Sequence, residues 1–299
     1  MCRLFGFRSA VPSRAHRSLL LAENALAEQS LQHPDGWGIG WFVDDDAYLV
    51  KSATPAHACE RFRAISDRLT SHTFVVHVRR ATVGTIDPLN AHPFRYGRWL
   101  FAHNGTIHGF AAEDGELRAW MLDRTQPKLA MTRLGDTDSE HLFLYLLSCM
   151  ADAGVDPSGH QAAEGRAVAG ALRTGLLALD AEARRRGHDR PTTNVILTDG
   201  RVLLAHRAGN PLHVSTQKSS CEDAPTCPVV EKVCLGGTRP LTGRVNHLLV
   251  ATERIGAENR WEELEDGATI VLDACWTVAL VAPIAGWTNP KATLAEQGR

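Results

Sequence analysis

The sequence opens with MCRLFGFR, residues 1–8, which places a cysteine directly behind the start methionine. The alternation of side chains from Cys2 onward is typical of a short β-strand. If Met1 is removed, the Cys2 thiol lies beside a free α-amine with a pKa of about 7.7–8.0, which could act as its general base. The position of Cys2 alone favours a simpler interpretation, in which its side chain is only a small buried apolar group. Other parts of the sequence are needed to choose between this interpretation and a nucleophile.

Length and composition bound the class of protein. The chain has 299 residues, of which 44% are hydrophobic and 22% charged, as is typical of a globular protein with a sizeable core. Its formal net charge of -2 gives no reason to expect nucleic acid or an anionic membrane as a partner. The first residues contain no uninterrupted apolar stretch that resembles a signal peptide, and the sequence has no run of about 18 apolar residues, so we expect a cytoplasmic protein. Seven cysteines, an odd number, favour free thiols over a disulfide framework.

The hydrophobic pattern indicates groups of strands separated by helices. Helices are expected over residues 18–31, from about residue 138 behind the capping box TDSE, and around 168–179. Strands are expected at 36–43, 47–51, 71–79, 97–105, 246–252, 268–274 and 276–282, and a hairpin with Asp199-Gly200 at its turn at 194–207. Hairpin-linked strands with helices between the groups favour antiparallel sheets covered by helical layers over a doubly wound parallel sheet.

Two segments lack periodicity. Residues 216–244 are longer than an ordinary connection and predict either a functional lid or a disordered excursion, and residues 286–299 form a polar tail. Cys221, Cys227 and Cys234 lie in the first segment without C-x-x-C spacing, which does not match a standard zinc site.

Five polar clusters follow Cys2 along the chain, and each contains side chains capable of recognition, which four of them combine with glycine or proline. They are HPDGWGIGW (33–41), HVRRATVG (77–84), AHPF (91–94), AHNGT (102–106) and DTDSE (136–140). In this order the sequence resembles the class II glutamine amidotransferases, which are N-terminal nucleophile hydrolases, and in particular their stand-alone members without a synthase domain. The resemblance implies a four-layer αββα sandwich formed by one domain, residues 2–285, with an irregular insertion at about 216–244.

The resemblance assigns the reaction to three residues. It places the nucleophile on Cys2, whose α-amine, freed by removal of Met1, would act as general base directly or through a bound water. It places the oxyanion hole on the Asn104 side chain and the Gly105 backbone N–H. Taken alone, Asn104-Gly105 is equally the dipeptide of a type I′ hairpin turn.

The resemblance also assigns substrate contacts. Arg79 would bind the α-carboxylate of the substrate and Asp138 its α-ammonium group. The alternatives are a solvated strand residue for Arg79 and an acid that stabilises a helix N-terminus for Asp138. Arg80 stands where the family often has an aromatic residue. The remaining residues assigned to substrate binding lie in the same clusters, namely His77, Thr82 and His92.

These residues imply cleavage of a γ-glutamyl amide through a Cys2 thioester, with release of ammonia or an amine and then glutamate. No cofactor is expected, and the spacing of His77, His92 and His103 does not match a zinc site. Ammonia would pass to a separate synthase subunit, or the substrate would be a γ-glutamyl conjugate, as for the amidohydrolase of ergothioneine biosynthesis. A non-catalytic glutamine-binding module and a metal-dependent hydrolase are the rival classes, and the sequence offers neither as specific a feature as Cys2 with its ordered partners.

Overall fold

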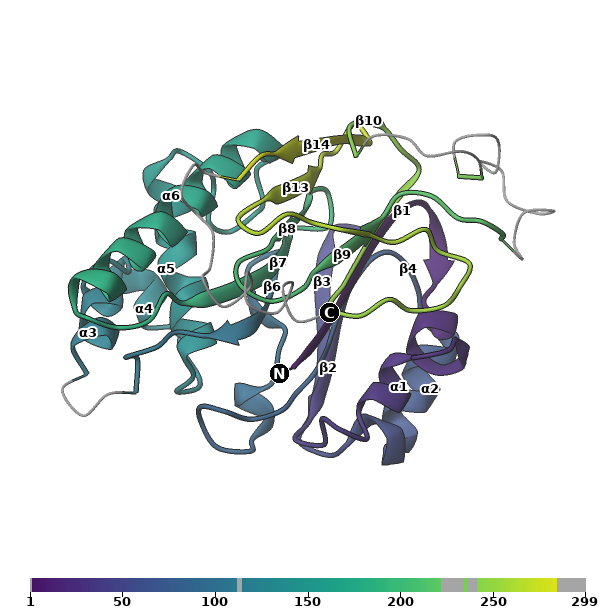
Figure 1. Cartoon of the computed structure of the whole chain (residues 1–299), viewed down its shortest axis with the longest axis horizontal. Coiled ribbons are helices and arrows are strands. Elements are labelled where there is room, and N and C mark those ends of the chain that lie inside the picture. The colour runs from purple at the N-terminus through teal and green to yellow at the C-terminus, as the bar shows by residue number, and fades with distance from the viewer. Residues whose placement is uncertain (1, 112–114, 222–233, 236–240, 284–299) are drawn as a thin grey trace, which may run out of the picture.

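Two antiparallel sheets of seven strands each lie face to face, and helices cover the outer face of each sheet (Figure 1). This computed structural model describes residues 2–111, 115–221, 234–235 and 241–283. The expected four-layer αββα arrangement is confirmed. No helix in these ranges is long and apolar enough to cross a membrane.

The first sheet has the strand order β12-β9-β11-β1-β4-β2-β3. Its strands are β1 (Arg3–Arg14), β2 (Trp37–Val43), β3 (Asp46–Ser52), β4 (Thr70–Val78), β9 (His213–Ser215), β11 (His247–Ala251) and β12 (Glu262–Glu263). The N-terminal strand β1 is therefore central, with β11 on one side and β4 on the other. Phe5 pairs with Ala251 of β11 and with Val76 of β4.

The second sheet has the order β10-β14-β13-β8-β7-β6-β5. Its strands are β5 (Phe94–Tyr96), β6 (Trp99–Thr106), β7 (Thr192–Thr198), β8 (Leu203–His206), β10 (Gly243–Arg244), β13 (Thr269–Leu272) and β14 (Thr277–Val281). The expected hairpin is confirmed as β7 and β8, with Gly200 in the left-handed region (φ 88°) at its turn.

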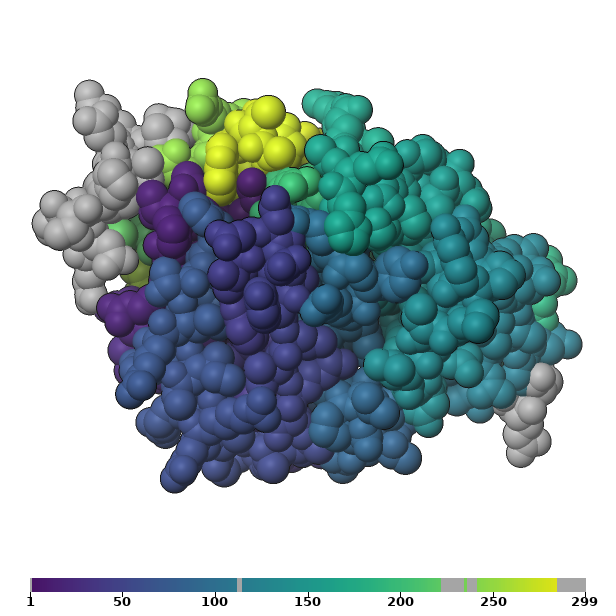
Figure 2. Space-filling view, turned by 180° about the vertical axis from the view of Figure 1, so that it is seen from behind, coloured from purple at the N-terminus to yellow at the C-terminus, as the bar shows by residue number. Residues whose placement is uncertain are grey.

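The helices form the two outer layers. Helices α1 (Leu26–Gln29) and α2 (Glu60–Arg68) cover the first sheet, and α3 (Glu116–Asp123), α4 (Pro127–Ala130), α5 (Asp138–Asp152) and α6 (Gly165–Arg185) lie against the second. Figure 2, seen from behind, shows the purple and blue N-terminal part of the chain beside the teal helical part.

An apolar core fills each of the three spaces between the four layers. Because successive side chains of β1 point to opposite faces of its sheet, this strand contributes side chains to two of the cores. Phe5 and Phe7 point toward α1 and α2, whereas Leu4 lies in the core between the sheets. Gly6 faces the same inner side, where a Cβ would lie only 3.1 Å from the side chain of Ile196. The pattern of MCRLFGFR therefore places β1 at the centre of the molecule.

One expected helix is wrong in its extent. Residues 18–31 do not form a single helix, because a π-helical turn (Arg17–Leu21) and α1 are separated by a break. Asn24 in the break has a positive φ of 59°, and its side-chain amide donates to the carbonyl of Arg254 at 3.0 Å. The helical spacing that includes Leu19 and Leu26 therefore spans two separate pieces, and the break between them contacts a distant segment.

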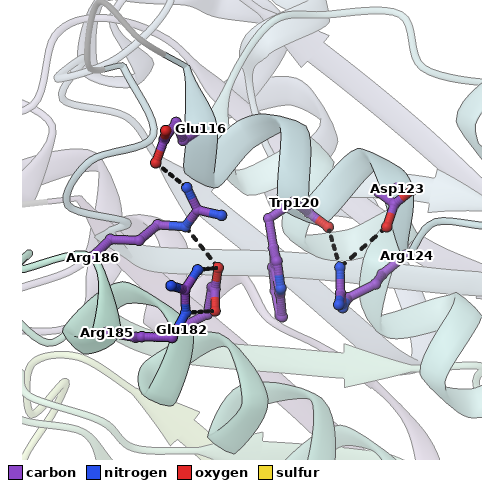
Figure 3. Close-up of polar contacts among 7 residues, drawn as sticks. All are labelled: Glu116, Trp120, Asp123, Arg124, Glu182, Arg185 and Arg186. Atoms are coloured by element: carbon purple, nitrogen blue, oxygen red, sulfur yellow. Dashed lines mark hydrogen bonds and ion pairs between the residues drawn. The ribbon is translucent and has the colours of Figure 1, made fainter.

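Charged side chains connect α3 to α6 on the surface of the second helical layer (Figure 3). Arg186 donates to Glu116 of α3 and, at 2.7 Å, to Glu182 of α6. Glu182 also accepts two hydrogen bonds from Arg185, at 2.8 and 2.7 Å. Arg185 and Arg186 lower the pKa of Glu182 to about 2. This network joins α3 to α6 in the helical layer that also contains α5.

Gly38 of β2 is required by close packing between the sheets. A Cβ at this position would lie 2.0 Å from the carbonyl oxygen of His92. We therefore expect Gly38→Ala to lower the free energy of unfolding by at least about 2 kcal/mol, as measured by urea denaturation. The control is Gly170→Ala, on the exposed side of α6 with no atom within 4 Å, which should stabilise the protein by about 0.5–1 kcal/mol. Equal effects of the two substitutions would contradict this packing.

Candidate active site

Cys2 immediately precedes β1, at the centre of the first sheet. Its thiol donates to the carbonyl oxygen of Arg80 at 3.2 Å and accepts from the Arg80 N–H at 3.3 Å. Burial raises the pKa of the Cys2 thiol, while the Arg80 hydrogen bond and the Arg79 guanidinium act in the opposite direction. Because the thiolate is the nucleophilic form, this thiol needs a base. Met1 lies outside the described residues.

Arg79 follows β4, the neighbour of β1, and the HPDG segment fixes its backbone. The Arg79 N–H donates to the carbonyl of Gly36 at 2.8 Å, and the Arg79 carbonyl accepts from Asp35 at 3.1 Å. The Asp35 carboxylate accepts from the N–H of Ala81 at 2.8 Å. The cluster at 33–41 therefore positions the cluster at 77–84, a role that its sequence alone did not show.

The Arg79 side chain is buried, which excludes the solvated-strand alternative. Its guanidinium donates to the carbonyl oxygens of Thr85 at 2.9 Å and Val83 at 3.0 Å, so it fixes the loop after β4. Burial lowers the pKa of Arg79, and the acids Asp35, Asp136 and Asp138 raise it. A guanidinium has five N–H groups, and the two bonds to carbonyl oxygens leave donors for a substrate carboxylate.

Asp138 lies in the first turn of α5, as the TDSE pattern predicts. The Thr137 hydroxyl accepts from the N–H of Glu140 at 3.2 Å and caps the helix. The capping box is not reciprocal, because the Glu140 carboxylate accepts from Leu134 and Gly135 instead. Asp138 is buried, and one of its oxygens accepts from the N–H of Ile107 at 2.9 Å. Its charge adds to the effect of burial in raising the pKa of the Cys2 thiol.

Asn104 and Gly105 belong to β6, so the hairpin-turn alternative for this dipeptide is wrong. They pair with Asn194 and Thr193 of β7 in a regular antiparallel ladder. A Cβ at Gly105 would lie 1.7 Å from the carbonyl oxygen of Thr192, which explains the glycine. The Asn104 side-chain amide has no hydrogen bond to any residue that the structure describes, so its N–H groups are available to a ligand.

His103 connects the Asn104 strand to the Asp138 helix. Its Nε2 lies 3.0 Å from the carbonyl oxygen of Thr192, and its Nδ1 lies 2.9 Å from the hydroxyl of Ser139. The carbonyl can only accept, so Nε2 carries the proton of the neutral ring. Ser139 in turn lies 3.2 Å from the Asp138 carboxylate. These contacts fix the spacing between the proposed oxyanion donor and the proposed ammonium contact.

The three remaining residues that the resemblance assigns to substrate binding differ in their burial. His77 and His92 are buried, and their rings lie 4.2 Å apart. Burial lowers the pKa of both imidazoles well below the ordinary value. Thr82 is exposed on the loop after β4, and Arg80 is exposed beside it. Substrate contacts by His77, Thr82 and His92 remain predictions.

A cavity of about 500 Å³ adjoins Asn104 on the β11 side of Cys2. Its lining includes Arg3, Asn210, Thr252 and Arg254, which come from segments far apart in the sequence. The carbonyl of Asn104 accepts from the Asn210 side chain at 3.4 Å. None of these four lies in a motif, so sequence analysis missed them, and only their convergence in the fold reveals them.

The cysteines of the irregular segment are only partly described. Cys221 is half-buried and Cys234 is buried, while Cys227 and most of residues 222–240 lie outside the described residues, as does the tail at 286–299. Within the described ranges, no three His, Cys, Asp or Glu side chains converge as metal ligands. Cys59, Cys149 and Cys275 are free thiols, in agreement with the sequence-based expectation for these three.

The sequence and the fold are similar to those of known proteins. The chain is 28% identical to YafJ of Escherichia coli over 228 residues, 73% of this chain and 77% of YafJ. It is 37% identical to the gamma-glutamyl-hercynylcysteine sulfoxide hydrolase of Mycobacterium tuberculosis over 81 residues, 27% of this chain and 35% of the hydrolase. The solved structure of the glutamine aminotransferase class-II domain protein SPO2029 from Silicibacter pomeroyi has a TM-score of 0.61 at 21% identity, covering 94% of this chain and 99% of that one, and so shares its fold.

The comparison with protein families covers almost the whole sequence. The family model described as glutamine amidotransferases class-II matches residues 1–293, which include the strand that follows Cys2, the Arg79 loop, the Asn104 strand and the Asp138 helix. This chain therefore belongs to the class II glutamine amidotransferase family.

Proposed function

We propose that this protein cleaves a γ-glutamyl amide through a covalent thioester on Cys2. The observation that supports the proposal is a set of contacts between separate elements that carry the assigned residues. The Cys2 thiol before β1 is hydrogen-bonded to the backbone of Arg80, the residue after Arg79. Asp138 on α5 accepts from the N–H of Ile107, three residues after Asn104 of β6. The charges of Arg79 and Asp138 both act on the Cys2 thiol. A cation and an anion near one nucleophile suit a substrate that carries an α-carboxylate and an α-ammonium group.

In the proposed mechanism, removal of Met1 frees the α-amine of Cys2, which accepts the thiol proton. The thiolate attacks the γ-carbonyl carbon, and the negative oxygen that forms accepts hydrogen bonds from the Asn104 side chain and the Gly105 N–H. The C–N bond then breaks, and the departing nitrogen takes the proton from the α-ammonium group. Water attacks the resulting thioester, which yields glutamate and regenerates the thiol.

The half-buried position of Cys2 suits a nucleophile that must exclude bulk water yet admit a substrate. The rival interpretation, a non-catalytic glutamine-binding module, would use Arg79 and Asp138 equally well but would not need Cys2. The two interpretations therefore differ in covalent chemistry, not in affinity for glutamine.

Asp138→Asn tests the substrate contact. The asparagine retains an oxygen for the N–H of Ile107 but loses the charge, so we expect KM for glutamine to rise by about 10–100-fold while the melting temperature changes little. Steady-state glutamate release from glutamine measures this effect. An unchanged KM in a folded Asp138→Asn variant would remove Asp138 from the substrate site.

A second candidate function is delivery of ammonia to a separate acceptor subunit. The observation that favours it is a group of exposed apolar side chains on the two segments that flank Arg79 and Asp138, namely Ile86, Leu89, Met131 and Leu134. The two segments touch, because the N–H of Asp136 donates to Asn90 at 3.2 Å. This candidate predicts that glutamine is cleaved faster than any γ-glutamyl conjugate, and a conjugate hydrolase predicts the reverse.

A further inference from the structure

A second cavity, of about 520 Å³, lies on the helix-covered face of the first sheet. Phe5 and Phe7 of β1 and Leu249 of β11 form its apolar floor, and the lining continues along β1 to Arg14. We call it the bulge cavity, because a β-bulge of β1 forms one of its walls. Among the residues that the structure describes, its lining includes none of those assigned to the candidate active site. It is therefore a separate space, and its volume is typical of a site for a small molecule.

Two interruptions of regular backbone shape one wall of the bulge cavity. The pairing of β1 with β4 shifts register between Arg8 and Ser13, and the chain then enters the π-helical turn Arg17–Leu21. Pro12 from the bulge and Ser18 from the turn both line the cavity. Bulges and π-helical turns occur often next to functional sites, because they redirect the chain and its side chains.

Backbone hydrogen bonds hold another wall of the bulge cavity. Lys218, beyond the end of β9, pairs with Asn259 in an isolated antiparallel bridge, and both residues line the cavity. The N–H of Ser219 donates to the carbonyl of Glu258 at 2.8 Å, and the N–H of Lys218 donates to the carbonyl of Cys234, also at 2.8 Å. The Lys218 and Asn259 side chains therefore project from a fixed backbone.

Two deeply buried side chains of the lining each have a polar atom without a hydrogen bond to any residue that the structure describes. Asn259 is 7% exposed, and its amide N–H donates to the carbonyl of Ile255 at 3.1 Å, which leaves its Oδ1 without a partner. His247 is 6% exposed, and its Nε2 has no partner in the described ranges. Because buried polar groups are normally hydrogen-bonded, both atoms call for a group supplied from the cavity that they line.

The floor and the buried polar atoms together define the chemistry of a ligand. The Asn259 Oδ1 can only accept, so it needs an N–H or O–H donor. Water satisfies such an atom but gains nothing from the floor of Phe5, Phe7 and Leu249, whereas a flat apolar molecule with a donor at its edge satisfies both. The lining therefore favours an aromatic ring that carries a hydrogen-bond donor.

The lining also has an excess of positive charge. Three basic side chains, Arg14, Arg17 and Lys218, line the cavity with one acid of the described ranges, Glu258, which pairs with Arg17 at 3.8 Å. Lys218 acts on the interior, because its charge adds to the effect of burial in lowering the pKa of His247 to about 3. The imidazole is therefore neutral at pH 7, and the potential in the cavity favours an anion.

From these observations we propose that the bulge cavity is a second ligand site, for a small aromatic anion that carries an N–H or O–H donor. The ring would pack on Phe5 and Phe7, the donor would contact Asn259, and the negative group would lie toward Lys218. Such a ligand differs in chemistry and in place from a γ-glutamyl substrate at Cys2. The proposal therefore does not depend on the proposed function.

The test titrates the protein with two fluorescent probes that have the same rings and the same N–H, 8-anilinonaphthalene-1-sulfonate and N-phenyl-1-naphthylamine. Only the first is an anion. We expect wild-type protein to bind one sulfonate per chain, with a Kd at least about 10-fold lower than that of the uncharged probe. Lys218→Gln should remove most of this difference and leave the affinity for the uncharged probe unchanged. The matched control is Lys128→Gln, on the exposed side of α4, which should retain the difference.

Val11→Trp tests the location of both probes. Val11 is half-buried in the bulge and lines the cavity, so a larger side chain can occupy part of the space. We expect the Kd for both probes to rise at least about 10-fold, while thermal unfolding shows that the variant is folded. Val43→Trp, at the exposed end of β2, is the control and should bind both probes as the wild-type protein does.

Three results would overturn the second ligand site. They are equal affinity for the two probes in wild-type protein, an unchanged preference in Lys218→Gln, and unchanged binding in a folded Val11→Trp variant. Loss of sulfonate binding in Cys2→Ala would also overturn it, because the probe would then occupy the Cys2 site. Cleavage of glutamine is measured separately, so failure of the proposed function would leave this test intact.

Discussion

Cys2→Ala is expected to reduce glutamate release from glutamine by at least about 10⁴-fold, because it removes the sulfur that forms the thioester in the proposed mechanism. The substitution should leave the fold intact, since the Cys2 side chain is only half-buried and its two hydrogen bonds are to the backbone of one residue, Arg80. Coupled detection of glutamate, with enough enzyme to observe slow turnover, measures the loss.

Cys275→Ala is the matched control for this variant. Cys275 is an exposed free thiol, and its substitution should leave activity unchanged. If Cys2→Ala retained more than a small fraction of the wild-type rate while Cys275→Ala did too, the nucleophile would have to be another group and the mechanism would be wrong.

Asn104→Ala is expected to lower kcat by about 10²–10³-fold with little change in KM, as is typical when one oxyanion donor is removed. The structural reason is that the Asn104 side chain makes no hydrogen bond to any described residue, so its donors can serve the transition state alone. Steady-state kinetics with glutamine separate the two parameters.

Asn104→Asp gives a second, nearly isosteric variant. Its carboxylate fills the same space but cannot donate when ionised and would repel the negative oxygen, so kcat should fall at least as far as in Asn104→Ala. A change confined to KM in both variants would place Asn104 in ground-state binding instead.

Much of the fold could be predicted from local patterns. The alternation behind Cys2, the Asp199-Gly200 turn and the TDSE cap each depend on residues within a few positions of one another, and each matches the structure. The helix over residues 18–31 was wrong because its interruption at Asn24 depends on a contact with Arg254, more than two hundred residues away. Periodicity carries no information about such a contact.

The residues of the candidate site also fall into two groups, those that the sequence indicates and those that only the fold brings together. Cys2, Arg79, Asn104 and Asp138 could be proposed because they lie in motifs whose types and order resemble those of a known family. The residues of the neighbouring cavity could not, because Arg3, Asn210 and Arg254 have no motif and meet only where β1, the loop after β8 and the segment after β11 converge. Asn194 was missed for a related reason: its side chain acts by holding a loop and not by contacting substrate.

The measurement that tests the central claim most directly is the intact mass of the protein before and after brief exposure to the glutamine analogue 6-diazo-5-oxo-norleucine, with Cys2→Ala as control. The account predicts a wild-type mass that lacks Met1 and gains a single adduct, which maps to Cys2 and does not form in Cys2→Ala. Protein that lacks Met1 yet gains no adduct, or gains it at another residue, would contradict a Cys2 nucleophile and favour the non-catalytic glutamine-binding interpretation.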